Sequence, residues 1–192
     1  MVGTKDRIMD STAELFRRQG YNGTGIKQIL AAANAPFGSL YHFFPGGKED
    51  LGAQTIRSSG QLYMELFATI AVQAPDVLTA VSDFFTGAAQ TLEETDYADA
   101  CPIATVALEV ASTNEPLREA CTEVFDAWIG GASAYFTAAG IAPEKARELA
   151  LSMLCLLEGA FIFCRAMRST ESLHVAGASA VAAVREALES AA

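Results

Sequence analysis

The chain has 192 residues, of which 51% are hydrophobic and 19% are charged, and it carries a formal net charge of −10. This apolar composition excludes an intrinsically disordered chain, and the length fits one domain or a small domain joined to a larger one. The acidic balance excludes a protein that binds nucleic acid or anionic lipid over its whole surface, but it is compatible with a local basic patch.

Charge and glycine are distributed unevenly along the chain. Residues 1–57 contain seven lysines and arginines against five acidic residues, whereas the remainder contains six against eighteen. Nine of the fifteen glycines lie within the first sixty residues. We therefore expect short elements with tight turns at the N-terminal end and longer helices behind them.

Apolar residues at helical spacing predict four elements in the first part of the chain. Thr4 can cap the first helix and Gly20 can stop it. Asn34 tolerates the left-handed backbone of a tight turn, and Pro36 suits the first turn of the helix that follows. The four predicted helices cover residues 4–20, 24–33, 36–42 and 48–72.

The rest of the chain also has a helical period, with proline, glycine and asparagine between the elements. No alternation with a period of two extends over a useful length, so the sequence predicts an all-α fold. The further helices are expected over residues 75–92, from 102 onward, and over 114–140, 143–168 and 172–190. Asn114 is the predicted cap of the helix over 114–140.

Several classes of protein are not supported. The charged segment 1–10 does not fit a secretory signal, which predicts a cytoplasmic chain. The apolar run 149–167 contains Glu158 and Arg165 and is interpreted as a buried helix, so no membrane partner is expected. The four cysteines show no CxxC spacing, and the two histidines, His42 and His174, lie near no cysteine or carboxylate pair in sequence. We expect no metal site, no cofactor, no catalytic residues and no enzymatic activity.

The two short helices around Asn34 have the proportions of a helix-turn-helix, in which the second helix enters the DNA major groove. Spacing alone is a weak signal, because helical hairpins with short turns are common. Small residues would let the backbone approach a surface, and polar tips suit phosphate oxygens. The candidates with these properties are Thr24, Lys27, Gly38, Ser39, Tyr41 and His42.

Lys48 provides a separate argument for an anion. A cation in the first turn of a helix opposes the helix dipole and costs up to about 1 kcal/mol. Lys48 follows Gly46 and Gly47, so free backbone N–H groups and a positive side chain could bind one phosphate. Alternatively, Lys48 balances Glu49 and Asp50 on a solvated surface.

Two stretches, residues 20–30 (GYNGTGIKQIL) and 38–51 (GSLYHFFPGGKEDL), resemble the DNA-binding domain of TetR-family transcriptional regulators. They contain the Leu-Tyr-x-x-Phe-Pro and Lys-Glu-x-Leu elements in collinear order. The paired glycines before Lys48, together with residues 101–104 (CPIA) and 107–109 (ALE), are similar to the branch of LmrA- and YxaF-like regulators. The resemblance implies a DNA-binding domain at residues 1–50 and an effector-binding and dimerisation domain at residues 51–192.

The resemblance also assigns roles to residues. It implies that Thr24 and Lys27 meet the DNA backbone or a base edge, that Phe37, Gly38 and Ser39 face the groove, and that Tyr41, His42 and Lys48 hold phosphates. Three positions depart from the family pattern, namely Asn34 in place of glycine, Pro36 in place of a capping Ser or Thr, and Phe37 in place of a polar residue. Phe37 can contact a thymine methyl group or pack inward, and the sequence leaves both open.

Aromatic residues recur at helical spacing in the part of the chain after residue 57. Aromatic residues with this spacing more often belong to a hydrophobic core than to a binding site. The resemblance implies a pocket there, and an apolar lining in an acidic surround favours a small hydrophobic or cationic effector. Cys101 is interpreted as a gate residue, a redox-sensitive thiol or a buried inert cysteine. The predicted lining is Tyr63, Phe67, Phe84, Phe85, Cys101, Ile103, Trp128 and Met153.

The helix predicted at 143–168 is apolar on two faces, and one of them needs a partner. An intermolecular four-helix bundle with the last helix would make a homodimer, as the resemblance also implies. The expected interface is Ala150, Leu154, Leu157, Phe161, Val181, Val184 and Leu188.

We therefore hypothesise a ligand-responsive repressor that releases its DNA operator when a small molecule binds, while the sequence itself leaves open whether the small molecule releases DNA or promotes its binding. A dimer would present two recognition helices to a pseudo-palindromic operator, roughly 34–36 Å or a multiple apart. The alternative is a helical dimer that binds small molecules or protein without using DNA.

Overall fold

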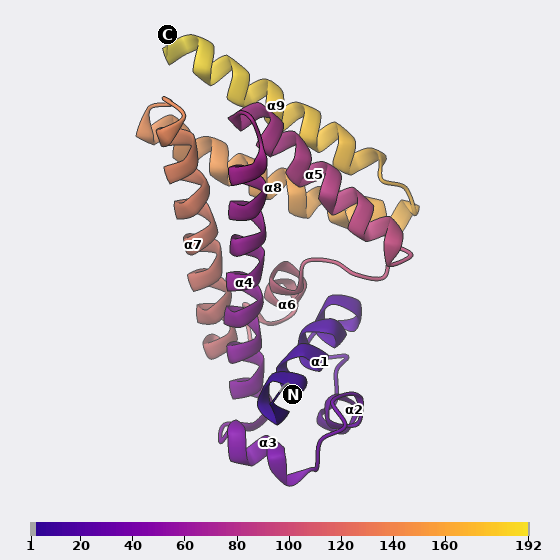
Figure 1. Ribbon diagram of the computed structural model, residues 1–192. Coiled ribbons are helices and arrows are strands. Elements are labelled where there is room, and N and C mark those ends of the chain that lie inside the picture. The colour runs from indigo at the N-terminus through magenta and orange to yellow at the C-terminus, as the bar shows by residue number, and fades with distance from the viewer. Residues whose placement is uncertain (1–2, 192) are drawn as a thin grey trace. The chain divides into compact units, whose positions relative to one another are not determined.

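The computed structural model describes residues 3–191, and these residues contain helices and no strand (Figure 1). The predicted all-α fold is confirmed. The helices are α1 (Thr4–Gln19), α2 (Ile26–Ala32), α3 (Gly38–Phe43), α4 (Gly47–Gln73), α5 (Val77–Glu94), α6 (Pro102–Val110), α7 (Glu115–Ala138), α8 (Pro143–Met167) and α9 (Glu171–Ala191).

Local capping explains several helix ends. Asn114 caps α7 through a hydrogen bond from the Leu117 N–H to its Oδ1 at 3.0 Å. Helix α5 begins at Val77 rather than at Pro75, and Asp76 caps it by accepting the Thr79 N–H at 2.8 Å. In each case a side-chain oxygen accepts a backbone donor that the first helical turn leaves unpaired.

Two helix starts near the N-terminus differ from prediction. The cap of α1 is Gly3 rather than Thr4, and α2 begins after Gly25 because Thr24 is turned into the protein. Pro36 and Phe37 form a turn before α3, in which the Ser39 N–H donates to the Pro36 carbonyl at 2.9 Å.

Contacts divide the chain into two compact units. Unit 1 comprises the residues up to Leu62 together with Cys101–Val124, and unit 2 comprises Tyr63–Ala100 together with the residues from Phe125 onward. Helices α4 and α7 each contribute to both units. The predicted domain boundary at residue 50 lies in the first turn of α4, and α6 belongs with the N-terminal helices.

Unit 1 holds its three N-terminal helices together with a small core. The side chains of Leu40 on α3 and of Phe44 just after α3 are fully buried. Ile8 on α1 and Ile29 on α2 are also fully buried. Burying one such side chain contributes about 1.5–3 kcal/mol, so this core fixes the orientation of α3 against α1 and α2.

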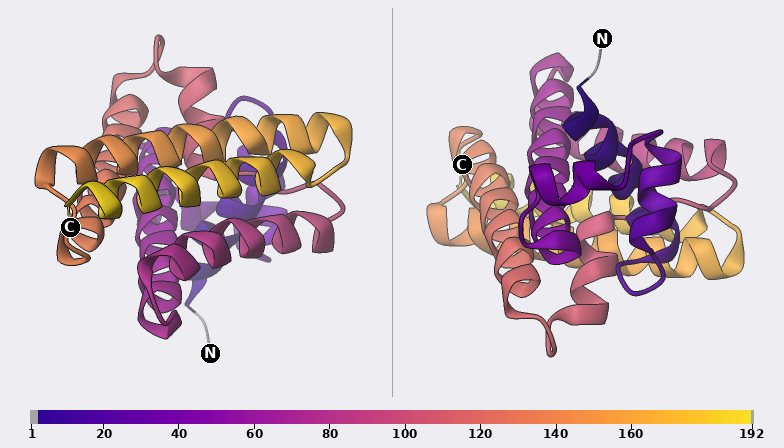
Figure 2. Two further views of the ribbon diagram at one scale, coloured as in Figure 1. Left: turned by 90° about the horizontal axis from the view of Figure 1, so that it is seen from above. Right: turned by 90° about the horizontal axis from the view of Figure 1, so that it is seen from below.

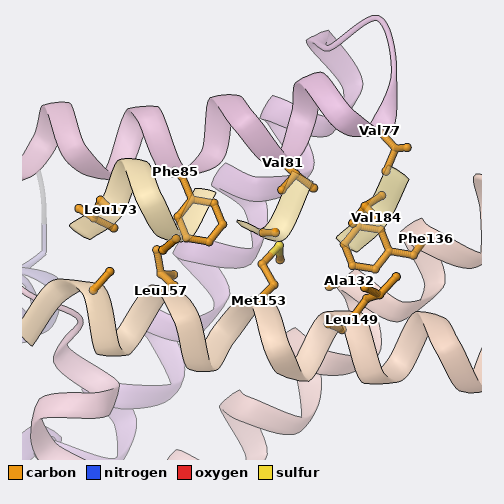
Figure 3. Packing of buried hydrophobic residues seen from close by; sticks show 14 of the residues in the cluster. Val77, Val81, Phe85, Ala132, Phe136, Leu149, Met153, Leu157, Leu173 and Val184 are labelled. Carbon is orange, nitrogen blue, oxygen red and sulfur yellow. The ribbon is translucent and has the colours of Figure 1, made fainter. Parts of the chain in front are cut away.

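Unit 2 is built on α5, α8 and α9, which lie alongside one another (Figure 2). Val81 and Phe85 on α5 point towards Met153 and Leu157 on α8, and Val184 on α9 lies in the same cluster (Figure 3). These residues form the larger apolar core of the chain.

This core corrects part of the predicted dimer interface. Ala150, Leu157 and Val184 are buried within a single chain, and Leu154, Phe161, Val181 and Leu188 are partly buried against the same core. The face of α8 that a single chain leaves exposed carries Leu151, Leu156, Ile162, Phe163 and Met167. Both apolar faces that the sequence showed, one with Leu149 and Met153 and the other with Ala150 and Leu157, contribute to the core of a single chain.

Among the described residues, one helix, α8, is long and apolar enough by length and composition to cross a membrane. That observation is weak evidence, because core helices of soluble proteins have the same properties. The inner face of α8 packs in one core with α5 and α9, and 33% of the apolar stretch of α8 is buried in this way.

Candidate nucleic-acid interface

The turn between α2 and α3 has a defined conformation. Asn34 adopts a left-handed φ of 47°, as its residue type predicted, and the Ala35 N–H donates to the Leu30 carbonyl at 2.9 Å. Arg7 on α1 donates from Nε to the Ala33 carbonyl at 3.1 Å. The turn is therefore held by α1 as well as by its own hydrogen bonds, and α3 follows it beside α1 (Figure 1).

One side of this helix-turn-helix is exposed and carries most of the predicted contact residues. Lys27 on α2, and Gly38, Tyr41 and His42 on α3, are exposed, and Ser39 is half-buried. The segment thus presents polar tips and one cation on a small, rigid surface.

The structure decides between the two interpretations of Phe37. Its side chain is 56% exposed, so it does not pack inward. Its ring lies 6.3 Å from that of Tyr41, centroid to centroid, and Tyr41 is itself 53% exposed. Phe37 also lines a surface depression of about 500 Å³ together with Lys27, Leu30, Ala31, Asn34, Ala35 and Pro36.

Thr24 does not have the predicted position. Its side chain is only 1% exposed, and its hydroxyl donates to the Gly20 carbonyl at 2.6 Å and accepts from Gln19 at 3.3 Å. The Thr24 side chain therefore stabilises the turn between α1 and α2 and is not available to DNA.

Lys48 is engaged within the chain. Its Nζ donates to the Tyr21 carbonyl at 2.7 Å and lies 4.0 Å from the centre of the Tyr21 ring. Partial burial lowers the pKa of Lys48, and the nearby Glu109 carboxylate opposes that change. Glu49 is bound elsewhere, because its carboxylate accepts from the Asn114 side chain at 2.7 Å. Lys48 and Glu49 therefore have separate partners, and Lys48 does not balance Glu49 as the alternative interpretation expected.

Glu109 on α6 is a residue that the sequence did not single out for this site. Its carboxylate accepts the Asn22 N–H at 2.7 Å and covers Gly20, where a β-carbon would collide with it. Gly20 has a φ of 73°, so its backbone also favours glycine. Helix α6 packs on α1 in unit 1 and is hydrogen-bonded to the turn that precedes α2. No local pattern indicates a contact between residues so distant in the chain.

The predicted effector-binding residues fall into both units. Cys101 and Ile103 belong to unit 1, where the Cys101 sulfur caps α6 by accepting the Ala104 N–H at 3.4 Å. The other six belong to unit 2, where Phe85 and Met153 are core residues.

The partly buried aromatic residues of unit 2 contact one another edge to face. The Phe67 ring centre lies 5.2 Å from that of Phe84 and 5.8 Å from that of Tyr135. Tyr63 and Trp128 form a second pair at 6.2 Å. Within residues 3–191, no group of three or more His, Cys, Asp or Glu side chains is placed to hold a metal ion.

Comparisons with known proteins match both parts of the chain. Residues 8–54 match the family of bacterial regulatory proteins named after TetR, and residues 77–179 match the C-terminal domain of LmrA/YxaF-like transcriptional regulators.

Individual relatives match over most of the chain. The chain is 32% identical to the HTH-type transcriptional regulator YxaF of Bacillus subtilis over 81% of this chain and 82% of that protein. It is 29% identical to the regulator LmrA of the same organism, over 90% and 92% of the two chains. A solved TetR transcriptional regulator from Legionella pneumophila shares the fold, with a TM-score of 0.84 and 21% identity over 94% of this chain and 96% of that one. The chain belongs to the TetR family of DNA-binding transcriptional regulators, with a C-terminal domain of the LmrA/YxaF-like type.

Proposed function

We propose that this protein is a cytoplasmic, ligand-responsive repressor that binds a pseudo-palindromic operator as a homodimer. We further propose that it releases the operator when a small hydrophobic or cationic molecule binds. The observation that carries this proposal is the exposed face of α3, which is held rigidly by the buried core of unit 1. A recognition helix has to combine such a face with such a core.

The proposed DNA contacts follow from exposure and chemistry. Tyr41, His42 and Ser39 can donate hydrogen bonds to phosphate oxygens, and Lys27 and Lys48 supply positive charge. The Lys48 ammonium group donates one hydrogen bond to the Tyr21 carbonyl, and it has two further N–H donors. Phe37 and Gly38 stand at the start of α3, the end that faces base edges in this motif.

The proposed effector site uses the aromatic residues of unit 2. Tyr63, Phe67, Phe84 and Trp128 are partly buried and contact one another in edge-to-face pairs. Apolar and aromatic linings are typical of sites for small hydrophobic ligands. We therefore expect Trp128→Ala to alter the response to the effector without altering the choice of operator.

Release of DNA requires a structural connection, and α6 supplies a candidate. Its carboxylate Glu109 holds the turn at Asn22, so a movement of α6 would act directly on the start of α2. An effector can shift the protein towards the released state only if it binds that state more tightly.

The proposed homodimer uses the exposed face of α8. Leu151, Ile162, Phe163 and Met167 are at least half exposed in a single chain, and Val175 on α9 is 60% exposed. Large apolar residues on one face, beside a second helix with small residues, fit an intermolecular four-helix bundle.

The experiment that tests the function is a fluorescence-anisotropy titration of the protein against its own upstream intergenic DNA at two salt concentrations, with a scrambled duplex as control. We expect sub-micromolar, salt-dependent binding that prefers the upstream DNA. Equal binding to both duplexes at both salt concentrations would contradict the repressor function. A retained complex then serves to screen hydrophobic and cationic compounds for release.

A further inference from the structure

The start of α3 carries an apolar side chain whose exposure the fold does not explain. At the other end of α3, Phe44 is fully buried and Phe43 is partly buried against the core of unit 1. Phe37, in contrast, is 56% exposed and contributes little to that core. Exposing a phenyl ring to water is unfavourable by about 25 cal/mol for each Å² of apolar surface, so a binding partner would gain by covering it.

The surroundings of Phe37 are also apolar. Pro36, Ala35 and Ala31 line the same depression of about 500 Å³, while Lys27 and Asn34 add polar groups to it. The Asn34 carbonyl faces Arg7, at 3.5 Å from its guanidinium. Beside the polar groups of Lys27 and Asn34, the surface next to Phe37 therefore offers apolar side chains for van der Waals contact.

Gly38, the next residue, removes an obstacle to close approach. A β-carbon at Gly38 would meet no atom within 4 Å, and the residue does not adopt a left-handed backbone. The fold thus does not require glycine here. A missing side chain at an exposed helix start lets the backbone approach another molecule closely.

Only one group on the base edges of the major groove matches these properties. A phenyl ring has no donor or acceptor and cannot read the hydrogen-bonding pattern of the bases. The 5-methyl group of thymine is the one apolar feature of that pattern.

We propose that Phe37 is a specificity-determining residue that selects thymine at one position of each operator half-site by covering its 5-methyl group. This inference rests on the proposed operator binding. Affinity that does not depend on the DNA sequence comes from Lys27, Tyr41 and Lys48. Phe37 adds a preference for thymine that depends on one methyl group.

The test compares thymine with uracil, which differs by that methyl group alone. A preferred duplex is first obtained by selection from a random-sequence library with the full chain. Each symmetric pair of thymines in it is then replaced by uracil, one pair at a time, and affinity is measured by anisotropy. We expect one pair at which uracil weakens binding by about fourfold for each half-site, the value of one buried methyl group.

Two variants separate methyl recognition from a general loss of binding. Phe37→Ala should bind the thymine and uracil duplexes equally, and Phe37→Leu, which keeps an apolar side chain, should retain a preference for thymine. Because Phe37 is exposed, both variants should keep the thermal stability of the parent protein.

The outcomes are distinguishable. Indifference of the parent protein to uracil at every thymine overturns the proposal, as does a thymine preference that Phe37→Ala retains in full. Failure of the selection to enrich any sequence would instead overturn the operator-binding function on which the proposal rests.

Discussion

The carboxylate of Glu109 on α6 accepts the backbone N–H of Asn22, 87 residues earlier in the chain, at 2.7 Å. Both residues lie in unit 1, so α6 is directly hydrogen-bonded to the turn that leads into the helix-turn-helix. The same carboxylate raises the pKa of Lys48 against the effect of burial. One acidic side chain therefore stabilises both a backbone turn and the charge of a proposed DNA-binding lysine.

Replacement of Glu109 should separate these two effects. Glu109→Ala removes the acceptor and should lower the free energy of unfolding by about 1 kcal/mol, the value of a partly exposed hydrogen bond to a charged group. Glu109→Gln keeps an acceptor oxygen and should preserve most of that stability. Both variants remove the negative charge, so both should lower the pKa of Lys48. Urea unfolding and an NMR titration of the Lys48 side chain measure the two quantities. A Lys48 pKa that neither variant changes would contradict this interpretation.

Gly20 and Gly38 make a matched pair of glycines. Gly20 has a φ of 73°, and a β-carbon there would collide with the Glu109 carboxylate, whereas Gly38 has open space around it. Gly20→Ala should therefore cost at least about 2 kcal/mol of stability. Gly38→Ala should leave stability unchanged or raise it by up to about 1 kcal/mol, and should weaken DNA binding by obstructing close approach. Thermal unfolding compares the two, and equal destabilisation by both would show that Gly38 is also required by the fold.

Lys48 is expected to serve both the fold and DNA. Lys48→Ala removes the contact with the Tyr21 ring and should cost about 0.5–1 kcal/mol of stability. If Lys48 also contacts a phosphate, the slope of log affinity against log salt should shrink by about 1 for each half-site. The dimer should stay intact. Lys145→Ala, in an exposed ion pair with Glu148 on α8, is the control and should leave the salt slope unchanged. An unchanged slope in Lys48→Ala would assign this lysine to folding alone.

Features that depend on neighbouring residues could be predicted from the sequence. The cap at Asn114, the left-handed turn at Asn34 and the start of α6 at Pro102 follow from the conformational preferences of single residues. The helix-turn-helix motif lies within thirty residues, and the structure places its predicted exposed residues on one surface.

Features that depend on distant residues could not be predicted. Thr24 was expected to face DNA, because the sequence does not show that its hydroxyl would turn back to Gly20. Lys48 was expected at an open surface. Its hydrogen-bond partner Tyr21 lies 27 residues away, so no local pattern indicated the contact. On α8, Leu157 and Phe163 are equally apolar, and only the packing of α5 and α9 decides that the first is buried and the second exposed.

Cys121 should make stability depend on pH in the alkaline range. Burial raises the pKa of its thiol from 9.0 to about 11. The folded chain therefore keeps a proton that the unfolded chain releases near pH 9. The stabilisation is complete below pH 9 and is lost as the pH rises towards 11, by about 2–3 kcal/mol over the whole window.

The Cys121 effect can be isolated from other alkaline titrations by comparing slopes. Cys121→Ala should lose less stability than the parent protein between pH 8.5 and 10.5 in urea unfolding, whatever its absolute stability. Cys155→Ala, at an exposed position on α8, should show the slope of the parent protein. Parallel pH profiles for the parent and Cys121→Ala would show that this thiol does not carry the effect.

Phe163 tests which face of α8 forms the homodimer. The side chain is 60% exposed in a single chain, so an aspartate there should not disturb the core of unit 2. A charge in the centre of an apolar interface should raise the dimer dissociation constant by at least about thirtyfold. Sedimentation over a series of protein concentrations should therefore show dissociation of Phe163→Asp at concentrations at least about thirtyfold higher than for the parent protein, with parental helix content. Val184→Asp, which places the same charge in the core of one chain, should instead unfold unit 2. A dimer dissociation constant that Phe163→Asp leaves unchanged would place the interface on another face, because no well-packed interface accommodates that charge at its centre.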